Sequence, residues 1–203
     1  MIGWFLSVMA CVLIMQGCPS SAQAADSVPV PIGTQTMGFT VGPFHPVRVL
    51  SAQSSKLFGM AVIPSWSIAL TDQIGSGWYR GQLALGAEFM LFHTTDPIGA
   101  SGIGFTPKIA YTWTSLTRVR PFVEGGGGPM WTDLGGRVPE QPGEFNFLVW
   151  GGAGLAWAIH PSWTVQAGYR LVHISNSGTR TRNSGLNFGL PFIGLSYLFS
   201  SAP

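Results

Sequence analysis

The chain has 203 residues, which is a typical length for one domain, and its composition separates it from most soluble proteins. Only 9% of its residues are charged, against about 25% in soluble globular domains, while 28 are glycine and 8 are tryptophan. Few charges with many aromatic residues exclude a disordered chain, and a formal net charge of +2 argues against a nucleic-acid partner. We therefore expect a folded protein that meets an apolar environment.

The first 24 residues have the character of a secretory signal peptide. Residues 1–17 are almost wholly apolar, and Ala22-Gln23-Ala24 forms the small-x-small pattern that precedes a cleavage site. The alternatives are acylation at Cys18, which follows a poor lipoprotein box, and an uncleaved anchor, for which the segment is shorter than the ~20 residues of a spanning helix. Both cysteines lie inside this segment, so residues 25–203 have no thiol or disulfide chemistry.

After the signal, apolar and polar residues alternate in segments separated by turn residues. Leu83, Leu85 and Phe89, for example, alternate with Gln82 and Glu88. An alternation of two residues predicts β-strands, and no later stretch is long and apolar enough for a membrane helix. The eight predicted strands are 34–42, 58–70, 78–92, 103–113, 118–131, 145–159, a strand that begins at residue 163, and 189–199.

Long alternating strands with few charges are typical of a transmembrane β-barrel. We expect an all-β fold, an eight-stranded antiparallel transmembrane β-barrel over residues 25–203, in the bacterial outer membrane after the signal peptide is removed. Side chains fill the interior of such a narrow barrel, so its charges would pair with one another there. The alternative is a soluble barrel with its apolar face turned inward, which would have few charges on its outer surface. The expected interior charges are Arg80, Glu88, Lys108, Arg120, Glu124 and Arg170.

Two other sequence patterns predict neither a phosphate-binding loop nor a metal site. The glycine run 125–128 lacks the lysine and the strand-to-helix context of a phosphate-binding loop, and glycine within a strand more often marks a kink or close packing. The histidines have no metal-ligand spacing, so we expect no metal and no other cofactor. They are His45, His93, His160 and His173.

The seventh predicted strand carries a histidine and a serine on its apolar face. Residues i and i+2 of a strand share a face, so His173 and Ser175 point the same way as Tyr169 and Leu171, and Arg170 points the opposite way. Unless a bulge intervenes, the pair faces lipid near the membrane boundary, with Arg170 inside the barrel. A histidine can take the proton from a serine and make it a nucleophile. The plainer interpretation is an interfacial histidine beside a hydrogen-bonding serine.

Longer motifs around this pair resemble a known enzyme family. Tyr-Arg-Leu-Val-His-Ile-Ser-Asn-Ser-Gly at 169–178 and Asn-Ser-Gly-Leu-Asn at 183–187 resemble the signature of the lipid A 3-O-deacylases of the PagL and acyloxyacyl hydrolase-like family. Segments 120–127, 145–147 and 151–154 look like its other recurrent segments. The resemblance implies an outer-membrane barrel that hydrolyses an ester-linked acyl chain of lipid A, with lipopolysaccharide and outer-membrane lipids as its partners.

The resemblance also implies roles for individual residues. Ser175 would be the nucleophile and His173 its base. Asn183 and the backbone amide of Gly178 would stabilise the oxyanion, with Asn176 beside them. Donors of this kind commonly contribute a few kcal/mol to the transition state.

The chain departs from the family pattern at Asn187. The acid that orients the histidine would be a glutamate fourteen residues after it, and this chain has an asparagine there. An amide can hold the ring but cannot stabilise an imidazolium with a negative charge, and in a serine protease this change lowers turnover ~10⁴-fold. Glu140 and Glu144 are possible substitutes. The main hypothesis is therefore a serine esterase of lipid A that uses Ser175, His173 and Asn187. The alternatives are a weak or inactive barrel that keeps the scaffold, and a small porin or adhesion barrel.

Overall fold

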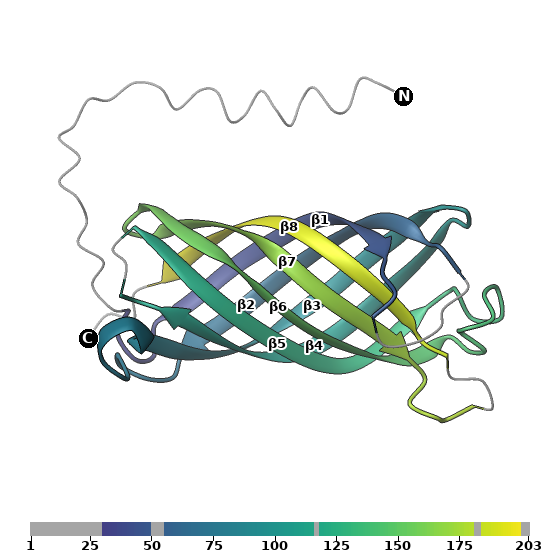
Figure 1. Cartoon of the computed structure of the whole chain (residues 1–203), viewed down its shortest axis with the longest axis horizontal. Helices are drawn as coiled ribbons and strands as arrows, with labels where there is room; N and C mark the ends of the chain where they lie inside the picture. The colour runs from purple at the N-terminus through teal and green to yellow at the C-terminus, as the bar shows by residue number, and fades with distance from the viewer. Residues whose placement is uncertain (1–29, 50–54, 116–117, 181–183, 200–203) are drawn as a thin grey trace, which may run out of the picture.

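Eight antiparallel strands close into a barrel in the computed structural model, because the last strand pairs with the first (Figure 1). The structure describes residues 30–49, 55–115, 118–180 and 184–199, so the predicted signal peptide and Cys18 lie outside it. Within these ranges no helix is long and apolar enough to cross a membrane. The predicted eight-stranded fold is confirmed. The elements are β1 (Gln35–Pro46), β2 (Phe58–Ala69), η1 (Gly77–Tyr79), β3 (Gly81–Asp96), β4 (Ala100–Trp113), β5 (Val119–Thr132), β6 (Phe145–His160), β7 (Trp163–Ser175) and β8 (Leu186–Phe199).

Several strands are longer than the side-chain alternation predicts. The pairing of β3 with β4 continues to Thr94 opposite Ala100, and β8 begins with Leu186 opposite Ile174. Backbone hydrogen bonds, which do not depend on the polarity of the side chains, set these ends. The start of the third strand was predicted too early, since residues 77–79 form the 3-10 helix η1.

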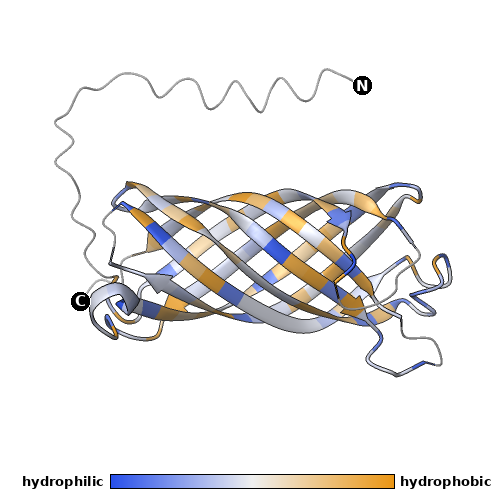
Figure 2. Cartoon of the chain, in the orientation of Figure 1, coloured by the Kyte–Doolittle hydropathy of each residue, from blue (hydrophilic) through white to orange (hydrophobic). Residues whose placement is uncertain are grey.

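The outer wall of the barrel is apolar. In β3, Leu85, Phe89 and Leu91 are exposed while Glu88 and Met90 between them are buried, as the alternation predicts. Figure 2 shows hydrophobic residues recurring along the strands of the wall. A wall of this kind is typical of a barrel surrounded by lipid, as is an aromatic belt at each end. Examples from the two ends are Trp131 with Phe145 and Trp163 with Tyr197, whose ring centroids lie 5.0 and 4.9 Å apart.

One half of the barrel interior is a packed hydrophobic core. It lies at the end where β7 ends and β8 begins. Phe44 packs edge-on against Phe92 and Phe188, with ring centroids 5.8 and 5.0 Å away. The connection between β5 and β6 adds the buried side chains Leu134 and Val138 to the same core. This end of the barrel is therefore closed by side chains.

A charge cluster lies across the middle of the interior. Arg170 from β7 contacts Glu88 at 2.9 Å and Glu124 at 2.7 Å, and Lys108 lies 3.5 and 3.4 Å from the same two carboxylates. The guanidinium of Arg170 also stacks over the ring of Trp150, 4.0 Å from its centroid. The predicted pairing of interior charges is confirmed for these two acids and two bases.

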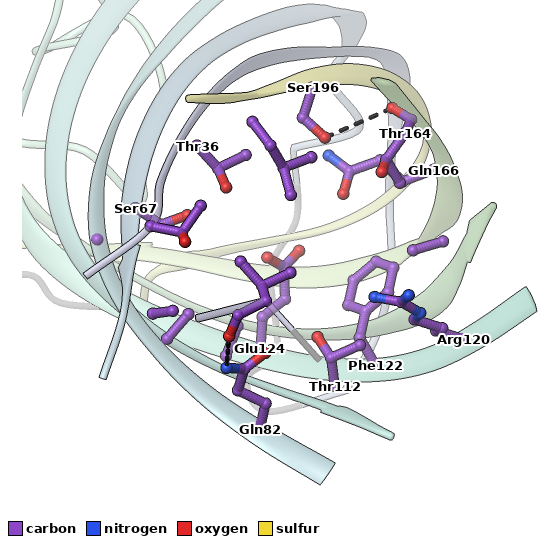
Figure 3. A pocket seen from close by; sticks show the side chains of 18 of the residues that line it. Thr36, Ser67, Gln82, Thr112, Arg120, Phe122, Glu124, Thr164, Gln166 and Ser196 are labelled. Atoms are coloured by element: carbon purple, nitrogen blue, oxygen red, sulfur yellow. Dashed lines mark hydrogen bonds between the residues drawn. The ribbon is translucent and has the colours of Figure 1, made fainter. Parts of the chain in front are cut away.

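The predictions for two other arginines need correction. Arg80 lies outside the barrel interior and is exposed, because β3 starts only at Gly81. Arg120 does face the interior, where it lines a cavity of about 180 Å³ with polar and apolar walls at the end where β1 begins. It joins no ion pair among the described residues, and its buried Nε has no hydrogen-bond partner there. Figure 3 shows this cavity, with Thr36, Ser67, Thr112 and Gln166 on its walls.

The glycine run 125–128 lies within β5, so it is no phosphate-binding loop. A Cβ atom at Gly126 would lie 2.5 Å from the carbonyl oxygen of Pro107, and one at Gly128 would lie 2.1 Å from that of Phe105. Both distances are far below contact. These glycines therefore allow β5 to pack closely against β4, as glycine within a strand predicts.

Candidate active site on the outer wall

The candidate histidine and serine lie on the outer wall, near the end of β7. Leu171 is 44% exposed and His173 and Ser175 are half-buried, whereas Arg170 on the other face is only 1% exposed. The pairing of β7 with β6 runs unbroken from Thr164 to Ser175. Because no bulge intervenes, the predicted directions of these side chains are confirmed.

Asn187 lies directly beside His173. The two residues are partners in the ladder of β7 and β8, and His173 Nδ1 lies 2.8 Å from Asn187 Oδ1. A carbonyl oxygen only accepts, so this hydrogen bond requires the proton on Nδ1 and leaves Nε2 as the acceptor. A histidine that acts as a general base for a serine needs this tautomer. Asn187 is 2% exposed, so water competes little for the contact.

Gly185 supports the other side of the histidine ring and was missed as a site residue. Its φ is +67°, and a Cβ atom there would lie 2.5 Å from His173 Cε1. Only a glycine provides both the backbone conformation and the space. The signal was present in the Asn-Ser-Gly-Leu-Asn motif, but without a structure that glycine could equally belong to the turn.

Ser175 lies at the point where β7 no longer pairs with β8. It still pairs with Phe147 of β6, whereas the pairing with β8 ends at Ile174 opposite Leu186. Within the described part of the chain no hydrogen bond joins the Ser175 hydroxyl to His173. Contacts between nucleophile and base are often long in the absence of substrate and tighten in the complex.

A tight turn follows the serine. The side chain of Asn176 accepts a hydrogen bond from the Gly178 amide at 2.9 Å, and its carbonyl accepts one from the Thr179 amide at 3.0 Å. Ser177 and Gly178 have φ values of +51° and +79°. The Gly178 amide, a predicted oxyanion donor, is therefore engaged by Asn176 in this structure. Asn183, the other predicted donor, lies outside the described residues.

Neither glutamate of the β5–β6 connection occupies the position of the missing acid. Glu140 is 2% exposed and accepts hydrogen bonds from the backbone and hydroxyl of Ser55 at 2.9 and 2.6 Å. Glu144 is exposed. The ring nitrogen that an acid would contact is the one that faces Asn187. Across the described ranges, no three histidine, cysteine or acidic residues gather into a metal site.

An apolar groove of about 340 Å³ lies beside His173 on the outer wall. Val47 and Val49, which follow β1, form part of it, and the Val47 amide donates to the carbonyl of Asn187 at 3.0 Å. Val149 and Leu171 form more of the lining. Its polar groups are nearly confined to the histidine and the asparagine, so the groove suits a hydrocarbon chain that ends in a reactive polar group. None of the candidate catalytic residues lines the interior cavity of Figure 3.

Fold and site together define an outer-membrane β-barrel that carries a histidine, a serine and an amide on its lipid-facing wall. The family model described as "Lipid A 3-O-deacylase (PagL)" matches residues 58–196, which is most of the chain. The chain therefore belongs to this family, which is named after a lipid A 3-O-deacylase, and its barrel is of the kind found in the bacterial outer membrane.

Solved structures agree on the fold. The crystal structure of the outer membrane enzyme PagL is 23% identical, with a TM-score of 0.55 over 78% of this chain and 97% of that chain. That of Neisserial surface protein A (NspA) is 15% identical, with a TM-score of 0.56 over 82% and 97%. At these identities the likeness concerns the barrel alone. Among curated proteins, none matches this sequence.

Proposed function

We propose that this protein is a serine esterase that removes an ester-linked acyl chain from lipid A. One observation carries the proposal. The hydrogen bond from His173 Nδ1 to Asn187 Oδ1 holds the ring on the lipid-facing wall, on the same face as Ser175 and beside an apolar groove. The family match supports lipid A as the substrate. Because the site faces the bilayer, the substrate enters sideways from the membrane, and no deep pocket is needed.

The reaction has two halves. Ser175 Oγ attacks the carbonyl carbon of the ester while His173 Nε2 takes the hydroxyl proton. The tetrahedral intermediate then collapses, the bond from carbon to the sugar oxygen breaks, and the imidazolium returns its proton to that oxygen. Water attacks the acyl-Ser175 ester in the same way, with His173 again as the base. The products are a free fatty acid and lipid A that lacks one chain.

The turn after Ser175 supplies donors for the oxyanion. The Gly178 amide donates to Asn176 Oδ1, a neutral acceptor, at 2.9 Å. A developing oxyanion is a stronger acceptor than an amide oxygen, and in this mechanism it replaces Asn176 as the partner of the Gly178 amide. Asn183 provides the second donor in this scheme.

Asn187 makes the enzyme slow rather than inactive in this proposal. In a serine protease, the change from aspartate to asparagine costs ~10⁴-fold because the amide also favours the wrong tautomer. Here the oxygen of Asn187 faces Nδ1, which favours the right one. What is missing is the negative charge that stabilises the imidazolium. The same missing charge favours the second candidate function, an inactive barrel that keeps the scaffold.

The test is the mass of lipid A from cells with and without the protein. We expect the loss of one hydroxyacyl chain with the natural protein and none with Ser175→Ala. An alkyl fluorophosphonate, which labels activated serines, should modify the natural protein at Ser175. Identical lipid A spectra, together with no labelling, would establish the inactive barrel instead.

A further inference from the structure

One glutamine contacts the catalytic segment from a neighbouring connection. Gln141 lies between β5 and β6, is 0% exposed, and its Nε2 donates to the carbonyl oxygen of Ile174 at 3.2 Å. Ile174 stands between His173 and Ser175 in the sequence. A buried side chain of the β5–β6 connection therefore contacts the backbone that joins the two reactive residues.

This hydrogen bond lies at the last residue of β7 that pairs with both neighbouring strands. The ladder with β8 ends at Ile174, and the turn that begins at Asn176 has two residues with positive φ. The carbonyl of Ile174 and the amide of Ser175 belong to one rigid peptide plane. Fixing the orientation of that plane leaves φ of Ser175 as the one backbone torsion that decides where the Ser175 side chain points.

The backbone of Gln141 is itself held by hydrogen bonds within the β5–β6 connection. Its amide donates to the carbonyl of Val138 at 3.2 Å, and its carbonyl accepts from the Gly136 amide at 2.8 Å. The preceding residue, Glu140, accepts two hydrogen bonds from Ser55. The β5–β6 connection is thus tied to the segment that precedes β2 as well as to β7.

Stability alone does not account for a glutamine at this position. Its neighbours in the connection, Leu134 and Val138, belong to the hydrophobic core, and its own Oε1 is buried with no hydrogen-bond partner among the described residues. A buried polar atom without a partner is destabilising. An apolar side chain of the same length removes that unsatisfied oxygen together with the hydrogen bond to the Ile174 carbonyl, so the two effects on folding oppose each other.

We propose that Gln141 is a positioning residue, which orients the peptide between His173 and Ser175 and so restricts where the serine hydroxyl lies relative to the histidine. The inference rests on the proposed esterase function and adds to it a residue that touches neither substrate nor reacting atoms. Misplacement of a reacting group by about 1 Å lowers rates by up to ~10²-fold, so we expect a loss of about tenfold when this hydrogen bond is removed.

The experiment compares Gln141→Met with Leu134→Met, a matched change in the same connection at a side chain that is also 0% exposed. In refolded full-length protein, we expect Gln141→Met to slow fluorophosphonate labelling of Ser175 and to lower kcat on lipid A, each about tenfold. We expect KM and the thermal midpoint to stay near those of the natural protein. Leu134→Met should retain the natural labelling rate.

Two results would overturn the inference. One is a Gln141→Met variant that labels as fast as the natural protein. The other is a slower rate that merely follows a loss of folded protein, equally in both variants. If the natural protein neither labels nor hydrolyses lipid A, the proposed function is wrong, and hydrogen exchange of the 171–178 peptide still tests the contact. Faster exchange in Gln141→Met than in Leu134→Met supports it, and equal exchange refutes it.

Discussion

The two faces of β7 differ in the charge of the groups that hold their polar side chains. On the inner face, the positive charge of Arg170 lies within 3 Å of carboxylates on Glu88 and Glu124. On the outer face, three residues further along, the ring of His173 is held by the neutral amide of Asn187. Both residues are held by specific polar contacts, but only the inner one is held by negative charges.

The difference follows from the surroundings of each face. The interior cluster contains two acids and two bases whose charges balance one another. A carboxylate at position 187 would lie beside lipid and an apolar groove, with only a transient imidazolium to balance it. A charge in that place is costly until the reaction creates its partner. In the proposed mechanism, the amide avoids this cost and gives up transition-state stabilisation in return.

The largest expected effect is on the inner face. Arg170→Met leaves Glu88 and Glu124 buried with Lys108 as their remaining cation in the cluster, 3.5 and 3.4 Å away. Removing one partner of a buried ion pair costs about 3–5 kcal/mol, and we expect a fall of that size in the free energy of unfolding. Urea unfolding of the protein in lipid vesicles measures it. The exposed Arg180→Met is the control, and an unchanged midpoint for Arg170→Met would show that the cluster contributes little.

The next effect is on the outer face. Asn187→Glu places a carboxylate against His173 Nδ1 and should raise kcat, by about 10²-fold within the ~10⁴-fold limit seen when a serine protease loses its acid. Asn187→Gln has the same side-chain length without the charge and should not gain. Initial rates of fatty-acid release from lipid A micelles measure both. Equal rates for the two variants would mean that charge at this position does not limit the reaction.

A substitution at Gly185 tests how the ring of His173 is held on the outer face of β7. Gly185→Ala puts a Cβ atom 2.5 Å from His173 Cε1, so we expect the ring to shift and kcat to fall about tenfold. Gly77→Ala is the matched control, because Gly77 also has a positive φ, +58°, but has no atom within 4 Å of the added Cβ. The same loss of activity in both variants would assign the effect to backbone strain.

The smallest effect concerns the ring beneath Arg170. Trp150→Phe keeps an aromatic face but weakens the contact with the guanidinium, which lies 4.0 Å from the tryptophan centroid. We expect a loss of about 1 kcal/mol in the free energy of unfolding. The loss should shrink when Arg170 is already methionine, because the cation is then absent. A double-mutant cycle in urea measures the coupling, and additive losses would exclude a cation–π contribution.

Much of the molecule could be predicted from local pattern. The alternation in β7 predicted correctly that His173 and Ser175 face outward and Arg170 inward, because a strand repeats every two residues and its register stays intact here. Arg80 was predicted to face the barrel interior. That prediction failed because the short 3-10 helix η1 interrupts the alternation of the third predicted strand just before β3. Side-chain polarity does not reveal where a backbone ladder ends.

The sequence by itself determined the class of protein, the number of strands, the face of each residue on β7 and the absence of a glutamate at position 187. These follow from composition and from a repeat that neighbouring residues establish locally. Only the tertiary structure decided which residues meet across strands. It placed Asn187 rather than Glu140 or Glu144 against His173, left Arg120 outside the interior ion pairs, and brought Gln141 to the carbonyl of Ile174. Contacts of this kind join positions far apart in the sequence, 82 residues in the case of Arg170 and Glu88, and they depend on the closure and register of the whole barrel.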